Sequence, residues 1–260
     1  ELIGVGPEYR WRVINYGENA YNFILEGNYL FELLTSSRER PDVVVFFDGA
    51  NDAAMFTMYR HRQAHYGYEQ CRALVESYPR STLGVLKPLN AAWIASFTRE
   101  LIRKVRYIGH SVKPDDPQLN GYAESCQLRY ETLESLLAAN GIRIVVIWQP
   151  NCWIQNQARA ADSRAWAFVT GLGPSRYRES HRTVSDAISR RLAPKPWFHD
   201  LSHSLETGDD SPLPFYQNDG VHFTDAGRKA VVQSMLPFLT PSPADKAMPG
   251  NRVSQGLSYE

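Results

Sequence analysis

The sequence predicts an α/β fold built on a parallel sheet. Two apolar runs, Val43 to Phe47 and Ile142 to Trp148, are rich in β-branched and aromatic residues, which is typical of strands buried on both faces. Segments with helical spacing of apolar residues separate these runs, and this alternation indicates parallel strands joined by crossover helices. The chain has 260 residues, of which 43% are hydrophobic, so we expect one large domain over residues 1–240.

The first elements follow the order strand, helix, strand. Trp11 to Tyr16 is predicted to be a short strand, and Glu18 to Leu34 carries apolar residues at helical spacing. The strand Val43 to Phe47 comes next and is followed by a sharp break at Gly49. This order predicts that the first two strands lie parallel to each other in one sheet.

Residues 53–117 are too many for an ordinary connection and are rich in helix formers. An apolar stripe within them, from Leu89 to Ile108, predicts a packed helix. We expect this insertion to cover the carboxyl edge of the sheet as a lid or a substrate wall.

The second half is predicted to contain five further elements and a tail. They are a helix over 124–140 that stops at Asn140-Gly141, a strand over 142–148, a helix over 175–192, a short strand over 197–201 and a closing helix over 224–239. Residues 241–260 are rich in proline and glycine, which predicts a disordered tail.

Charge and hydropathy exclude some partners. Lys plus Arg and Asp plus Glu both number 28, so no net field favours nucleic acid, and we expect no nucleic-acid partner. No apolar run approaches the roughly 20 residues of a membrane span, which predicts no transmembrane segment. The chain opens on Glu1 without an initiator methionine, so we expect the true N-terminus to lie upstream, and the sequence assigns no compartment.

Two polar loops are candidates for chemistry. Asn51 follows a buried strand, where ligands bind in open α/β sheets; the alternative is that Gly49 and Asn51 only form a turn and Asp52 caps the next helix. Asp219 and His222, three apart on a loop, can pair so that the carboxylate fixes the imidazole tautomer and leaves a general base. A plain surface loop or a metal pair would show the same two residues, but no further His or Cys lies at ligand spacing.

Three segments together resemble the second, third and fifth sequence blocks of the SGNH (GDSL-type) hydrolases. They are residues 13–20 (VINYGENA), residues 49–52 (GAND) and residues 219–222 (DGVH), and they occur in the family's order. The resemblance covers about residues 11–52 and 140–240. It implies a three-layer α/β/α, flavodoxin-like fold and a serine esterase that needs no cofactor and no metal.

Carried over by position, the resemblance makes His222 the general base and Asp219 its orienting carboxylate. It makes Asn51 an oxyanion donor through its side-chain amide, with Gly49 allowing close approach of the backbone. The family's second backbone donor is a glycine, and the matching position here is Ala20. A backbone N–H remains available at an alanine when φ is negative, so we expect Ala20 to keep this role.

The family's nucleophilic serine lies in a block after the first strand, roughly 30 residues before the position matched by Asn15, about the length of a strand-helix unit. Only 14 residues precede Asn15, and none of them is serine, so we expect the nucleophile and the first strand upstream of residue 1. Ser211 stands in a Gly-Asp-Asp-Ser run but in the wrong part of the chain. The Gly-x-Ser-x-Gly elbow of other α/β hydrolases does not occur.

The predicted function is therefore ester hydrolysis, on an acyl ester or an acetylated carbohydrate, with residues 1–260 alone inactive. The main alternative is a non-catalytic domain of the same fold that binds a carbohydrate or an acyl group. A flavodoxin-like phosphate-binding domain is a further alternative, but no glycine-rich phosphate loop follows any predicted strand.

Overall fold

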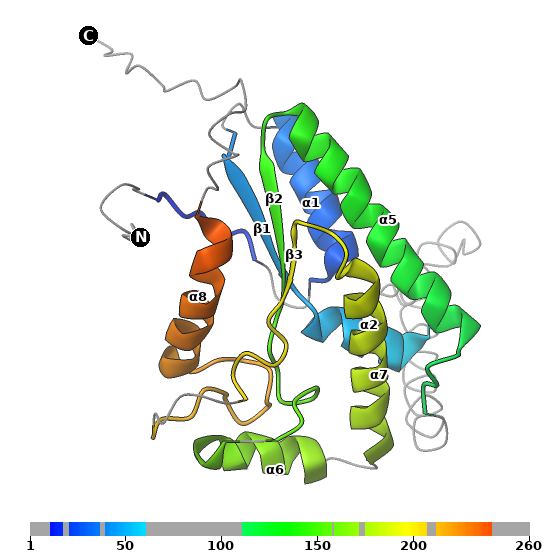
Figure 1. Cartoon of the computed structure of the whole chain (residues 1–260), viewed down its shortest axis with the longest axis vertical. Helices are drawn as coiled ribbons and strands as arrows, with labels where there is room; N and C mark the ends of the chain where they lie inside the picture. The colour runs from blue at the N-terminus through cyan, green and yellow to red at the C-terminus, as the bar shows by residue number, and fades with distance from the viewer. Residues whose placement is uncertain are drawn as a thin grey trace, which may run out of the picture.

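The computed structural model describes residues 11–17, 21–36, 40–60, 111–157, 159–171, 175–206 and 212–240. Their centre is a three-stranded parallel sheet in the order β1-β2-β3 (Figure 1). The strands are β1 (Val43–Asp48), β2 (Arg143–Trp148) and β3 (Phe198–Asp200). The first pair runs in register from Val43 opposite Arg143 to Asp48 opposite Trp148, so both strands end at the same edge.

Burial along the strands follows their place in the sheet. All residues of the central strand β2 after Arg143 are buried, as expected for an apolar run between two neighbours. Strand β1 ends the described sheet on one side, and its Val45 remains 40% exposed. Among the described strands, β1 therefore has one paired edge and one outer edge.

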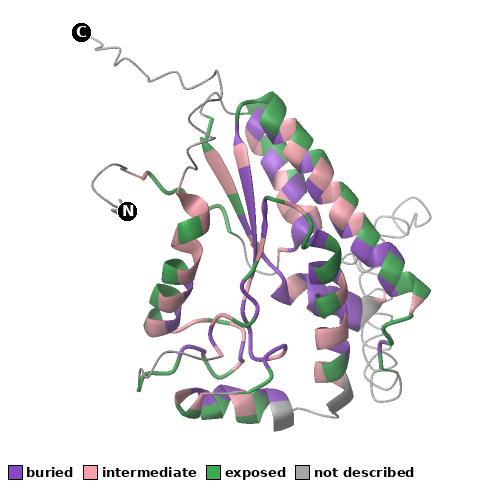
Figure 2. Cartoon of the chain, viewed as in Figure 1, coloured by how far each residue is buried: buried purple, intermediate pink, exposed green. Residues whose placement is uncertain are grey.

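Three helices cover one face of the sheet (Figure 1). They are α1 (Phe23–Ser36), α5 (Pro117–Ala139) and α7 (Ser175–Leu192). Their apolar residues pack with Phe46, Val146 and Trp148 in the largest core cluster. Figure 2 colours buried residues purple, and purple segments lie along β2, α1 and α5. The members contributed by α5 and α7 are Leu119, Tyr122, Ala123, Cys126, Tyr130, Leu133, Leu137, Val184, Ile188 and Leu192.

The opposite face of the sheet is covered by α8 (Asp225–Leu239). Its Met235 and Phe238 pack against Val145 and Ile147, whose side chains point away from the first core. Thr224 caps this helix by accepting a hydrogen bond from the Gly227 backbone N–H at 3.1 Å. The described chain is therefore a mixed α/β structure with helices on both faces of a parallel sheet.

Most predicted elements of the second half are confirmed within a few residues. Helix α5 begins at Pro117, before the predicted residue 124, because Asp116 caps it by accepting the Gln118 N–H at 2.8 Å and proline suits the first turn. Residues 160–171, for which no element was predicted, form the short 3₁₀ helix η2 (Ala160–Asp162) and α6 (Ser163–Gly171). Helix α5 ends where the sequence predicts, because Gly141 after it has φ 70°, a conformation that ends a helix.

The prediction of a strand from Trp11 to Tyr16 is wrong. Residues 11–17 contain no strand, and the neighbouring side chains Val13 and Ile14 are both about half exposed. A strand gains stability when one of its alternating faces is buried or when its backbone pairs. Since consecutive residues are both exposed here, neither face of this segment is buried, and the expected pairing with β1 is absent.

Helix α2 (Ala50–Tyr59) occupies the start of the predicted insertion over 53–117. Residues 61–110 of that insertion, which include the predicted helix from Leu89 to Ile108 and its lid role, lie outside the described residues, as does the tail 241–260. No helix within the described ranges combines the length and the apolar character that a membrane crossing requires.

Candidate active site

The turn between β1 and α2 requires glycine at position 49. Gly49 has φ 130°, a conformation that residues with a Cβ rarely adopt. A Cβ built there would lie 3.1 Å from the ring of Trp148, which is itself fixed by a 2.8 Å hydrogen bond from its Nε1 to the Ser185 hydroxyl. The backbone can therefore pass close over the indole only because residue 49 has no side chain.

Asn51 lies in the first turn of α2, beyond the carboxyl end of β1. Its Nδ2 donates a 2.8 Å hydrogen bond to the backbone carbonyl of Tyr21, and its side chain is partly exposed. A primary amide carries two N–H groups, so this bond orients the amide and leaves one donor for another acceptor. Ala20, the other predicted donor, lies outside the described residues.

Asp52 caps α2, as the alternative interpretation of this turn predicts, and it also contacts α1. Its Oδ2 accepts the backbone N–H of Gly49 at 3.1 Å, so the carboxylate caps its own helix. Its Oδ1 accepts the backbone N–H of Phe23, the first residue of α1, at 3.0 Å. The carboxylate thus lies between the N-termini of two helices, and its residue is only 1% exposed.

Two more carboxyl groups lie beside Asp52, and sequence reasoning did not find this cluster. Burial, followed by the charge of Glu26, raises the pKa of Asp48 well above its usual value. The Asp48 carboxyl is hydrogen-bonded to Glu26 and accepts the hydroxyl of Tyr130. Burial raises the pKa of Glu26 to about 7, although its hydrogen bond to Asp48 acts to lower it. The pKa of Asp52 is also raised to about 7, mainly by burial and then by the charge of Asp48. The cluster therefore holds protons near neutral pH.

The predicted pair on the loop before α8 is present as a hydrogen-bonded pair. His222 Nδ1 lies 2.6 Å from Asp219 Oδ2, and the histidine side chain is 67% exposed. Asp219 Oδ1 also accepts the backbone N–H groups of Val221 and His222, each at 2.9 Å. Partial burial acts to raise the pKa of Asp219, but the hydrogen bonds from the His222 ring and these two amides outweigh it, so the pKa lies below its usual value.

The loop that carries this pair is closed at its base. Gln217 N–H donates to the carbonyl of His222 at 2.7 Å, and Tyr216 forms an antiparallel bridge with Phe223. The turn inside it needs Gly220, whose φ is 74° and whose missing Cβ would lie 2.8 Å from a Val169 methyl group. The carboxylate and the imidazole are therefore held by hydrogen bonds made within eight residues.

The turn at Asn51 and the loop of His222 both lie at the carboxyl edge of the sheet. Phe47 of β1 packs against Phe223, with ring centroids 6.2 Å apart. Cys152, in the segment after β2, donates its backbone N–H to Gly220 at 2.8 Å. The loop is thus attached to the ends of both long strands, next to the end of β1 from which α2 starts.

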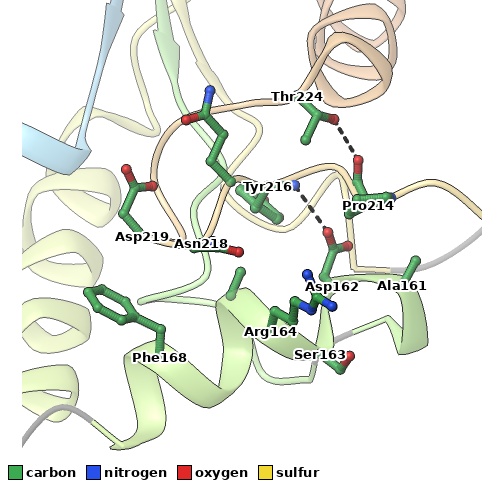
Figure 3. A pocket seen from close by; sticks show the side chains of 12 residues that line it. Ala161, Asp162, Ser163, Arg164, Phe168, Pro214, Tyr216, Asn218, Asp219 and Thr224 are labelled. Carbon is green, nitrogen blue, oxygen red and sulfur yellow. Dashed lines mark hydrogen bonds between the residues drawn. The ribbon is translucent and has the colours of Figure 1, made fainter.

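A cavity of about 730 Å³ lies between α6 and the loop of residues 214–224 (Figure 3). Its wall includes Asp219, Asn218 and Phe168 but neither Asn51 nor His222. Asp162, the last residue of η2, lies in the wall of this cavity and accepts the backbone N–H groups of Phe215 and Tyr216 at 2.6 and 3.0 Å. The cavity is therefore a neighbour of the Asp219–His222 pair, on the side of the loop that faces α6.

The described residues bring an imidazole and a side-chain amide to this edge of the sheet, but no hydroxyl or thiol that contacts the imidazole. No described hydroxyl or thiol is hydrogen-bonded to the His222 ring, and Ser211 lies outside the described ranges. Cys152 is close in space, but its residue is fully buried, and burial raises the pKa of its thiol to about 12, which makes it a poor nucleophile. Within the described ranges, no group of three His, Cys, Asp or Glu side chains is arranged to hold a metal ion.

The described residues form an α/β structure in which a histidine-carboxylate pair and the turn that contains Asn51 lie at the carboxyl edge of the sheet. No family model, no curated protein and no solved structure matches the chain.

Proposed function

We propose that this chain is part of an SGNH-type serine ester hydrolase with a flavodoxin-like, three-layer α/β/α fold. The observation that supports it most is the 2.6 Å contact between His222 Nδ1 and Asp219 Oδ2. The imidazole of His222 is at the same time exposed, so its other nitrogen can be reached from solvent. A carboxylate on Nδ1 fixes the tautomer whose Nε2 accepts a proton. The resemblance of three ordered sequence blocks to that family supplies the reaction class.

In the proposed reaction, a serine hydroxyl attacks the ester carbonyl while His222 Nε2 takes its proton. The carbonyl oxygen becomes an oxyanion that accepts hydrogen bonds from the Asn51 amide and from the backbone N–H of Ala20. His222 then returns the proton to the departing alcohol, which leaves an acyl-enzyme. Water, deprotonated by His222, releases the acid and restores the serine. The substrate is an acyl ester or an acetylated carbohydrate.

The nucleophilic serine and the first strand are proposed to lie upstream of residue 1. The outer edge of β1, where Val45 is 40% exposed, is the place where such a strand would pair in this fold. A parallel strand there would end at the same edge as β1, next to Gly49 and Asn51. A serine directly after it would then face the proposed oxyanion donors.

A non-catalytic binding domain of the same fold is the second candidate, and one observation favours it. The cavity of about 730 Å³ is lined by Ser163, Arg164, Gln217, Asn218 and Thr224 together with the ring of Phe168. Amides, hydroxyls and one aromatic ring are groups that can bind a sugar without chemistry. In this case substitutions of the His222 pair would leave binding unchanged.

The test is hydrolysis of p-nitrophenyl acetate by the protein with its natural upstream segment and by residues 1–260 alone. We expect turnover only with the upstream segment. In that protein, Asn51→Ala should lower kcat by about 10²–10³ with little change in KM, and His222→Ala should cost at least as much. Asp219→Asn should also lower kcat, by misorienting the imidazole.

Circular dichroism of each variant should show the parent's fold. Parent rates in folded Asn51→Ala and His222→Ala would contradict the hydrolase proposal and favour the binding domain.

A further inference from the structure

We infer that Asp52 is a positioning residue for the proposed ester hydrolysis, because its carboxylate joins the N-terminus of α1 to that of α2 and so holds the Asn51 amide in place. The inference rests on the proposed function. It assigns Asp52 no contact with substrate; the residue acts through Asn51.

The two oxygens of Asp52 serve two different segments. Oδ2 accepts the N–H of Gly49 at 3.1 Å, and Oδ1 accepts the N–H of Phe23 at 3.0 Å. Both amides belong to helix N-termini, where no intrahelical acceptor is available. A cap for α2 alone needs only the bond to Gly49. The bond to Phe23 crosses from one segment of the chain to another and therefore fixes where α2 starts relative to α1.

A second bond between the same segments runs through Asn51. Asn51 Nδ2 donates to the carbonyl of Tyr21 at 2.8 Å, next to the bond between Asp52 and Phe23. The intervening Asn22 holds its own segment rigid, because its side chain accepts the N–H groups of Ile24 and Leu25 at 3.2 Å. Two bonds between two stiff segments leave little freedom for the Asn51 amide to rotate.

The burial of Asp52 also favours a role beyond capping. A capping carboxylate normally reaches water, whereas this residue is 1% exposed and lies beside the carboxyl group of Asp48. Burial and then the charge of Asp48 disfavour its ionised form, while the amides of Phe23 and Gly49 favour it. Such an arrangement opposes folding stability, and proteins retain costly buried groups mainly at functional sites.

The experiment compares kcat and KM for p-nitrophenyl acetate in the protein with its upstream segment. Asp52→Ala removes both bonds and should lower kcat by about 10²-fold with KM within about twofold, since a displacement of about 1 Å costs that much. Asp52→Asn keeps one acceptor oxygen and should recover part of the loss. The matched control is Tyr122→Phe, which removes a buried 3.1 Å bond to the backbone carbonyl of Asp52 and leaves its carboxylate intact. This control should keep kcat within about twofold.

The double variant Asn51→Ala/Asp52→Ala identifies the route of the effect. If Asp52 acts through Asn51, the double variant should be no slower than Asn51→Ala, whereas independent effects would multiply. Amide hydrogen exchange gives a readout without catalysis: Phe23 and Gly49 should lose protection in Asp52→Ala and keep it in Tyr122→Phe.

The outcomes separate the two proposals. Normal kcat in folded Asp52→Ala, with Asn51→Ala impaired, would overturn the inference alone, as would multiplying losses in the double variant. An inactive parent, or an unimpaired Asn51→Ala, would overturn the proposed function and the catalytic role of Asp52 together.

Discussion

Replacing Glu26 by glutamine should remove a pH-dependent loss of stability. Glu26 lies on α1 beside the buried Asp48, and burial raises its pKa from 4.5 to about 7, with its bond to Asp48 opposing this shift and the charge of Asp52 adding to it. The folded state therefore holds a proton that the unfolded state releases. Its stabilising effect is complete below pH 4.5 and is lost as the pH rises to about 7.

The expected size follows from that shift. Raising the pKa of Glu26 from 4.5 to about 7 corresponds to about 3–4 kcal/mol, since each pKa unit is worth about 1.4 kcal/mol. Glutamine keeps an acceptor oxygen for the Asp48 carboxyl and does not ionise. Relative to the parent, Glu26→Gln should therefore gain about 3–4 kcal/mol of unfolding free energy between pH 4.5 and 8.

Urea unfolding followed by tryptophan fluorescence at several pH values measures this difference. The matched control is Glu32→Gln on the exposed side of the same helix, where water reaches the side chain in both states. This control removes a carboxyl from α1 without removing a buried one. A Glu26→Gln difference from the parent that stays constant between pH 4.5 and 8 would refute the view that the Glu26 carboxyl holds its proton in the folded state.

Two further predictions concern the loop of His222 and its neighbour Cys152. Gly220→Ala should destabilise the protein by about 1–3 kcal/mol more than Gly141→Ala, because both have φ near 70° but only residue 220 would press a Cβ to 2.8 Å from Val169; equal midpoints in thermal unfolding would contradict this. Iodoacetamide at pH 8 should label Cys152 in the folded protein at least about 10³-fold more slowly than after unfolding, since burial raises the pKa of its thiol from 9.0 to about 12. Peptide mapping locates the label, and rapid labelling of Cys152 in the folded protein would contradict its burial.

A strand could be predicted correctly from the sequence where the folded chain buries its apolar side chains between neighbouring elements. The run from Ile142 to Trp148 forms a strand because every side chain after Arg143 is buried between neighbours. Trp11 to Tyr16 also contains β-branched and aromatic residues, but none of its faces is buried, and local propensity alone does not make it a strand.

The same distinction holds for the candidate site. Asp219 and His222 are three residues apart, so a loop pattern was enough to predict their contact, which the structure contains. The carboxyl cluster joins Glu26 of α1, Asp48 of β1 and Tyr130 of α5, and no local pattern indicates which distant side chains will meet. The one available signal was an aspartate at the end of an otherwise apolar strand.

The closed base of the loop between Tyr216 and Phe223 determines what a spectroscopic probe of His222 would report. The contacts that hold the imidazole, from the Asp219 carboxylate to the Gln217 amide bonded to the His222 carbonyl, are all made within the loop. Such short-range contacts can persist when long-range packing is lost. A histidine NMR signal would therefore report on the order of the loop itself, whereas the indole of Trp148, bonded to Ser185 of α7, would report on the packing of β2 against that helix.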